Sequence, residues 1–108
     1  MTTITADFHG QTVITTFEMT PGTCTDVLDE LRAAYEQVIR LQPGFISACL
    51  HVNDAQTRIA NYSQWARRED FMAMLRTPEM RERNRRIAGL CRGFEPVMYE
   101  VAGVVGSP

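Results

Sequence analysis

The side chains best suited to chemistry lie in one short stretch, Asn61-Tyr62-Ser63-Gln64-Trp65. In an extended strand successive side chains alternate between two faces, so Asn61, Ser63 and Trp65 share one face. A carboxamide in the middle of an apolar strand is costly to bury without hydrogen bonds, so Asn61 either satisfies backbone groups or faces a cavity that holds a polar ligand. A lone tryptophan at a strand end is more often a core anchor. The stretch therefore predicts either a core or a small pocket with amide and indole donors.

Other reactive side chains have simpler explanations. Cys24, Cys49 and Cys91 form no Cys-x-x-Cys pair, which predicts reduced thiols and neither a disulfide framework nor a zinc site. Arg85 lies in a run of arginines and glutamates typical of a solvated helix face, from which one arginine can still turn toward a cleft. The sequence contains no phosphate-binding loop and no metal-binding motif, so we expect no metal or organic cofactor.

Hydrophobic periodicity predicts the elements that must position these residues. Thr23 is predicted to cap a first helix, and Thr77-Pro78 to restart a second helical region that ends at Gly93. The order βαββαβ is typical of a ferredoxin-like α+β fold, in which two helices cover one face of a four-stranded antiparallel sheet. Segments rich in β-branched or alternating apolar residues are predicted to form its strands: 11–19, 45–52, 57–65 and 97–105.

Composition is that of an ordinary globular protein. With 108 residues, 44% hydrophobic and 22% charged, the chain is predicted to form a single domain over residues 1–108, with residues 1–10 as an N-terminal arm. The net charge of −2 does not indicate the positively charged surface that binds nucleic acid or an anionic membrane. No apolar run reaches the roughly 18 residues of a membrane helix, and the N-terminus lacks the pattern of a secretory signal, so we expect a cytoplasmic protein.

Two helices can cover only one face of the predicted sheet. Along the second predicted strand, alternation sets Phe45 and Cys49 on one side and Ile46 and Leu50 on the other, so both sides are apolar. A bare apolar sheet of this size exceeds what a soluble monomer usually exposes. We therefore expect a homodimer joined through its sheet faces, with no nucleic-acid or membrane partner.

The chain carries Pro43-Gly44-Phe45-Ile46-Ser47-Ala48, then His51, then Asn61-Tyr62-Ser63-Gln64-Trp65, then Phe71. With these residues, and over roughly residues 13–101, the sequence resembles the antibiotic biosynthesis monooxygenase (ABM) family. The resemblance implies a single ABM-like domain that forms a dimeric α+β barrel, with a pocket between sheet and helices in each subunit. It also implies a cofactor-independent monooxygenase that oxidises an anthrone-like or quinol-like aromatic of polyketide type, with O₂ as co-substrate.

On that resemblance Asn61 and Trp65 are the leading catalytic candidates, and His51 and Arg85 are further members of a hydrogen-bonding or proton-relay set. Ground-state O₂ is a triplet, so the substrate must first become an electron-rich enolate or carbanion. The N–H groups of Asn61 and Trp65 are expected to stabilise the negative oxygen, and each such donor typically contributes about 3 kcal/mol. The expected substrate-binding residues are Leu50, Tyr62, Phe71, Met74, Leu75 and Met80.

The sequence departs from its best-matching relatives at several positions. Leu50 and Phe71 stand where the anthrone oxygenases of the family place tyrosines, so a proton relay would have to run through other groups, such as Tyr62 or Tyr99. Haem degradation is a second enzyme hypothesis, but Leu75 occupies the place of the haem-ligating histidine in those relatives. The hypothesis from another class is a non-catalytic, small-ligand-binding dimer of the same fold, since fold does not fix function.

The side of the sheet on which His51 lies depends on the hairpin register. If Val52 pairs with Thr57 across a four-residue loop, His51 and Asn61 point to opposite faces. A shift of one residue reverses that relation, because side chains alternate with a period of two.

Overall fold

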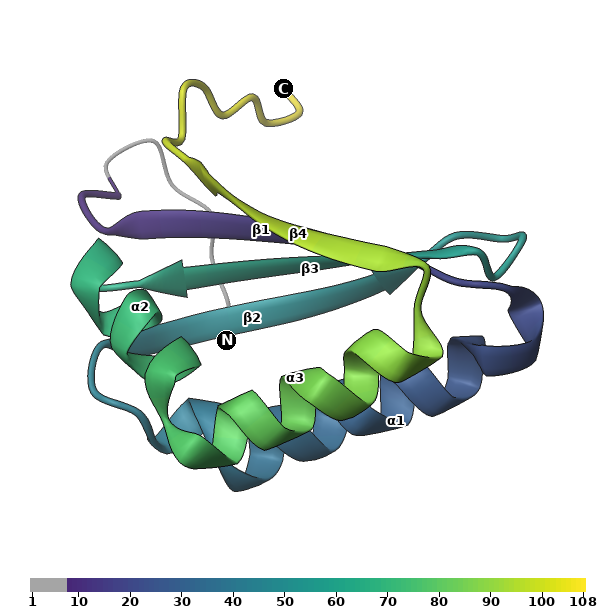
Figure 1. The fold of residues 1–108 in the computed structure, drawn as a ribbon. Coiled ribbons are helices and arrows are strands. Elements are labelled where there is room, and N and C mark those ends of the chain that lie inside the picture. The colour runs from purple at the N-terminus through teal and green to yellow at the C-terminus, as the bar shows by residue number, and fades with distance from the viewer. Residues whose placement is uncertain (1–7) are drawn as a thin grey trace.

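The chain folds into a four-stranded sheet with its helices on one side (Figure 1). The computed structural model describes residues 8–108, so residues 1–7 of the predicted N-terminal arm lie outside the described residues. The strands are all antiparallel, in the order β2-β3-β1-β4, and the predicted ferredoxin-like α+β fold is confirmed. The elements are β1 (Gln11–Glu18), α1 (Pro21–Gln37), the 3₁₀ turn η1 (Ile39–Leu41), β2 (Phe45–Val52), β3 (Arg58–Trp65), α2 (Arg68–Arg76), α3 (Pro78–Leu90) and β4 (Gly93–Tyr99).

The two long helices begin at threonine-proline pairs. In α3 the Thr77 hydroxyl accepts a hydrogen bond from the Met80 N–H at 3.3 Å, which confirms the predicted cap. In α1 the predicted cap at Thr23 is wrong, because Pro21 already occupies the first turn and its fixed φ suits that position. Thr23 lies inside the helix, and its hydroxyl donates to the Leu90 carbonyl of α3 at 2.9 Å.

The last strand is displaced from its prediction. The prediction placed it over residues 97–105, whereas β4 runs from Gly93 to Tyr99. Its limits follow from its partner, since Gly93 pairs with Glu18 and Tyr99 with Thr12 near the two ends of β1. Beyond Tyr99 the described part of the chain offers no further strand as a partner, and the valines at 101, 104 and 105 lie outside the sheet.

A bulge in β2 changes which side chains share a face. Phe45 pairs with Trp65 and Leu50 pairs with Asn61, with a register shift between Phe45 and Ser47. Phe45 and Leu50 therefore lie on the same side, and the prediction that set them on opposite sides is wrong. The extra residue, Ile46, is half exposed.

The β2–β3 hairpin settles the position of His51. Val52 pairs with Ile59, two residues beyond the predicted partner Thr57. The Asn53 side-chain oxygen closes the loop by accepting the N–H groups of Thr57 and Arg58, each at 2.9 Å. A shift of two residues preserves the alternation, so His51 lies on the face opposite to Asn61.

The turn before β2 requires its glycine. Gly44 has a φ of +82°, and a side chain at this position would collide with the carboxylate of Asp70 at the start of α2. The Gly44 carbonyl also accepts the Ala66 N–H at 2.7 Å, which ties the turn to the end of β3. This turn delivers Phe45 to the end of the core where Trp65 lies, with ring centroids 5.3 Å apart.

The core lies between the sheet and the helices. Among the described residues, Val13, Val27, Ile59 and Ile87 have no exposed surface, and each side chain of this size contributes roughly 1.5–3 kcal/mol on burial. They come from β1, α1, β3 and α3, so the core ties both long helices to the two central strands. None of the helices over residues 8–108 is long and apolar enough to cross a bilayer.

Candidate active site

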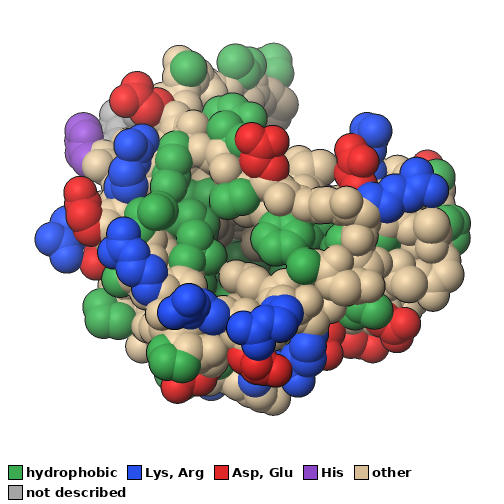
Figure 2. All heavy atoms as spheres, viewed as in Figure 1, with side chains coloured by type: hydrophobic (Ala, Val, Ile, Leu, Met, Phe, Trp, Pro, Cys, Tyr) green, Lys and Arg blue, Asp and Glu red, His purple; other side chains and the backbone are tan. Residues whose placement is uncertain are grey.

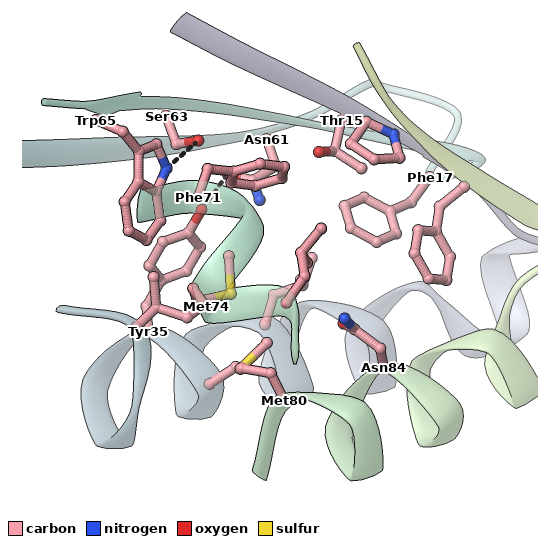
Figure 3. A pocket seen from close by; sticks show the side chains of 16 residues that line it. Thr15, Phe17, Tyr35, Asn61, Ser63, Trp65, Phe71, Met74, Met80 and Asn84 are labelled. Carbon is pink, nitrogen blue, oxygen red and sulfur yellow. Dashed lines mark hydrogen bonds between the residues drawn. The ribbon is translucent and has the colours of Figure 1, made fainter. Parts of the chain in front are cut away.

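The side of β3 that faces the helices forms one wall of a cavity of about 50 Å³ (Figure 3). Asn61, Ser63 and Trp65 all line it, as their alternation along the strand requires. Asn61 sits at the centre of the sheet, opposite Thr15 of β1 and Leu50 of β2. Figure 2, which has the view of Figure 1, shows hydrophobic side chains around a hollow between the sheet and the helices.

The Asn61 carboxamide is held at one end. Its residue is 9% exposed, and its Oδ1 accepts a hydrogen bond of 2.7 Å from the Tyr35 hydroxyl of α1. Burial raises the pKa of Tyr35 to about 12, so this phenol stays protonated and donates. Figure 3 shows the Asn61 amide nitrogen directed into the cavity, and it has no hydrogen-bond partner among residues 8–108. The site therefore offers an N–H₂ group to a guest.

Trp65 forms a wall of the cavity. It is 1% exposed and stands edge-on to Phe45 and Phe71, at centroid distances of 5.3 and 5.8 Å. Its indole N–H, which the sequence analysis assigns to a negative oxygen, is donated to the Ser63 hydroxyl at 3.3 Å. Ser63 in turn donates to the Val13 carbonyl at 3.4 Å. In this structure the indole supplies shape and apolar surface, and its donor is already engaged.

A second carboxamide, Asn84, lies on the other side of the cavity. It projects from α3, is half-buried and lines the cavity floor, where Figure 3 shows its amide directed inward. Within the described part of the chain Asn84 has no side-chain hydrogen bond. The cavity thus has a polar group on the sheet and another on the facing helix.

The space between the two amides is apolar and narrow. Phe71, Met74, Leu75 and Met80 line it, and these four are among the residues predicted to bind substrate. A cavity of about 50 Å³ holds a few water molecules, whereas pockets for organic ligands are typically about 300–1,000 Å³. Methionine side chains are unbranched and repack readily, so they are the part of this wall best able to move aside for a larger guest.

Comparison with known proteins assigns the family. Residues 11–86 match the family model for antibiotic biosynthesis monooxygenases. The chain belongs to the antibiotic biosynthesis monooxygenase family. The tetracenomycin-F1 monooxygenase of Streptomyces glaucescens is 33% identical to it over 69 residues, which is 64% of this chain. The match spans 62% of that relative's length.

Solved structures share the fold of this ABM protein. A monooxygenase from the ActVA-Orf6 gene of Streptomyces coelicolor, in complex with nanaomycin D, superposes with a TM-score of 0.80 at 23% identity, over 92% of this chain and 93% of that one. SnoaB, a cofactor-independent oxygenase from Streptomyces nogalater, gives a TM-score of 0.70 at 18% identity, over 90% and 97% of the two chains.

Two predicted catalytic residues of the ABM protein lie away from the cavity. His51 is exposed on the opposite face of the sheet, with its Nε2 3.7 Å from the Cys49 sulfur, because the hairpin register sets it there. Arg85 is on the solvent side of α3, where its side chain is 75% exposed and pairs with Glu82 at 2.9 Å. Neither residue contributes to the cavity lining, so the structure contradicts a direct role for either in this site.

Two predicted substrate-binding residues are also placed elsewhere. Tyr62 lies on the open face, since it alternates with Asn61, and its hydroxyl accepts the Gln64 amide N–H at 3.0 Å. Leu50 lies on the helix side but lines a separate groove, together with Phe45 and Tyr35, at the free edge of β2. The structure thus contradicts their placement in the wall of the cavity.

Sequence reasoning missed Tyr35, Thr15 and Asn84 as cavity residues of the ABM protein. A signal for Tyr35 was present, since a tyrosine on the buried stripe of a helix needs a partner for its hydroxyl. Asn84 offered a signal like that of Asn61, because it stands four residues after Met80 and three before Ile87, on the apolar stripe of its helix. Thr15 offered none, because threonine is common in strands.

The cavity carries little charge. Among residues 8–108, no carboxylate, histidine or arginine lines it, and Tyr35 is the one titratable side chain in the lining. Over residues 8–108 no group of three or more His, Cys, Asp or Glu side chains comes close enough to hold a metal ion. Its chemistry is that of fixed neutral donors in an apolar enclosure.

Proposed function

We propose that this ABM protein is a cofactor-independent monooxygenase that oxidises an anthrone-like or quinol-like aromatic with O₂. The observation that carries the proposal is the Asn61 amide, whose oxygen is held by Tyr35 and whose nitrogen faces an apolar cavity. The family assignment supports it, as do the names of its relatives, a tetracenomycin-F1 monooxygenase and a cofactor-independent oxygenase.

The proposed reaction balances without a reductant. A ring CH₂ group and O₂ give a carbonyl group and water. The substrate first loses a proton to become an enolate, which passes one electron to O₂, and the resulting radical and superoxide combine into a peroxide. The peroxide takes up a proton and loses water, which leaves the carbonyl. Each step before the last carries negative charge on an oxygen, and a fixed N–H donor stabilises that charge.

The residues of the cavity support a defined substrate class. Since no carboxylate or histidine lines the cavity, the protein offers no general base there, and the substrate must itself be acidic enough to lose its proton to water. Phenols, quinols and the enol forms of anthrones meet this condition. We propose that Asn61 binds the oxygen of the reacting ring and that Asn84 binds an oxygen at the far end. Phe71, Met74 and Met80 enclose the rings and move apart to admit them.

We also propose that two copies associate through the open sheet face. This face carries Ile14 and Tyr62, which are half-buried, and Val97 and Tyr99, which are 38% and 47% exposed. These side chains come from β1, β3 and β4 and lie on the side that the helices leave uncovered. An apolar patch of this kind is typical of an interface.

The first experiment is oxidation of dithranol, an anthrone with two ring hydroxyls, by the metal-free protein in air and under anaerobic conditions. We expect quinone formation that requires O₂ and that Asn61→Ala slows about 100- to 1,000-fold, the usual effect of removing one oxyanion donor. Thr25→Ala is the control, because it alters an exposed residue of α1 outside the cavity lining. Equal rates with and without protein would refute the proposal. Binding of the quinone without turnover would instead indicate the non-catalytic ligand-binding dimer.

A further inference from the structure

The Asn61 amide can serve an oxyanion in only one of its two orientations. A carboxamide has a nitrogen that donates and an oxygen that accepts, and the two ends have nearly the same shape. Rotation by half a turn about the last side-chain bond would direct the oxygen into the cavity, where it would repel a negative oxygen. The proposed function therefore needs a group that holds the amide in the donor orientation.

Tyr35 is placed to be that group. Its hydroxyl donates to Asn61 Oδ1 at 2.7 Å, the usual length of a well-formed O–H···O hydrogen bond. The ring is held in turn, since its centroid lies 5.9 Å from that of Phe45 in a tilted arrangement. If the amide were reversed, the Tyr35 hydroxyl would face an N–H₂ group and would lose its acceptor.

The neighbouring hydroxyl of Ser63 does not compete for this role. Ser63 is the next residue on the same face of β3, but it accepts from the Trp65 indole and donates to the Val13 carbonyl. Among the described residues, Tyr35 alone forms a hydrogen bond with the Asn61 side chain. The orientation of the amide thus depends on one bond between α1 and β3.

We infer that Tyr35 is a positioning residue, which fixes the Asn61 amide with its N–H₂ group toward the substrate. The inference rests on the proposed oxygenase function, and it makes α1 part of the active site. Tyr35 acts through Asn61 and takes no part in the reaction, since its own hydroxyl is occupied.

The test is a double-mutant cycle in the dithranol assay. Tyr35→Phe keeps the ring and removes the hydroxyl, and we expect kcat to fall about 10-fold with a smaller change in KM. In the Asn61→Ala background the same substitution should change kcat less than twofold, because the residue through which it acts is gone. An equal loss in both backgrounds would overturn the inference and leave the proposed function standing. Thr25→Val is the control: it removes an exposed hydroxyl of α1 that lies outside the cavity lining, and it should have no effect in either background.

A second readout does not depend on activity. The side-chain N–H₂ signals of Asn61, identified by their loss in Asn61→Ala, should form one sharp pair in the ¹⁵N NMR spectrum of the wild type. In Tyr35→Phe we expect them to broaden or to split between two orientations. An unchanged sharp pair would overturn the inference, even if dithranol proves not to be a substrate. If Tyr35→Phe does not fold, Tyr35→Met also lacks the hydroxyl and serves both measurements.

Discussion

The two faces of β3 carry the same functional groups and use them in opposite ways. On the helix side, the phenol of Tyr35 donates to the Asn61 amide oxygen, so the amide nitrogen is left for the cavity. On the open side, the amide nitrogen of Gln64 donates to the phenol of Tyr62 at 3.0 Å and to Thr12 at 3.4 Å. On that side the N–H₂ group of Gln64 therefore donates to residues of the sheet itself.

The difference teaches that the direction of a hydrogen bond matters more than the residues present. Each face pairs a tyrosine with a carboxamide, and each carboxamide is at most 9% exposed. Only the helix side combines a cavity with a donor that has no partner among the described residues. The helix side is therefore suited to chemistry, and the open side to association.

The largest expected effect is on dimer formation, which we assign to the open face of the sheet. We expect the wild type to sediment at twice the mass of the chain and Val97→Arg to weaken the dimer more than 100-fold, since an unpaired charge buried at an interface costs about 3–5 kcal/mol. Sedimentation over a range of concentrations measures this. The control is Val105→Arg, at a residue that is 97% exposed, which should leave the dimer intact. A monomeric wild type, or no difference between the variants, would contradict the assignment of the open face.

A smaller effect concerns stability in alkali. The folded protein keeps the Tyr35 proton up to a pKa of about 12, whereas the unfolded chain loses it near 10. Over this range the folded state binds more protons, so the free energy of unfolding falls as pH rises, by roughly 2–3 kcal/mol. Urea unfolding between pH 9 and 12 should show a shallower fall for Tyr35→Phe than for the wild type, while Thr25→Val, which removes an exposed hydroxyl of the same helix, should follow the wild type. Parallel curves for wild type and Tyr35→Phe would show that burial of this phenol is not the cause.

The smallest effect tests the far end of the cavity. Asn84→Leu keeps the number and branching of the side-chain heavy atoms and removes the amide. If Asn84 binds a substrate oxygen at the far end, KM should rise about 3- to 10-fold, the value of one hydrogen bond, for a dithranol derivative with a further hydroxyl on the ring edge away from the carbonyl. KM for dithranol itself, whose two hydroxyls flank the carbonyl, should change less than twofold. A similar rise for both compounds would assign Asn84 to packing alone.

Much of the architecture followed from local pattern. The run of β-branched residues in β1, the Thr77-Pro78 start of α3 and the alternation of Asn61 with Trp65 all depend on backbone geometry within a few residues. The same alternation placed the three β3 side chains in one cavity. The limits of β4 did not follow in this way, because they depend on where β1 ends.

The errors at the site share one origin. The sequence analysis grouped Asn61 with His51, Tyr62 and Arg85 by residue type and by position in a pattern. The hairpin register sets His51 on the other face of the sheet, and strand alternation does the same for Tyr62. Arg85 lies on the solvent side of its helix. The bulge at Ile46 likewise moved Phe45 to the side of Leu50. A change of one residue in register inverts every face assignment beyond it, and residue types alone do not reveal such a change.

Local pattern was sufficient to find the strand that bears the Asn61 amide and the side chains that share its face, because both depend on a repeat of two residues within one segment. The orientation of the amide, the narrowness of the cavity and the contribution of Asn84 required the packed molecule. They depend on Tyr35 and α3, which are remote in the chain and meet β3 only when the helices close over the sheet.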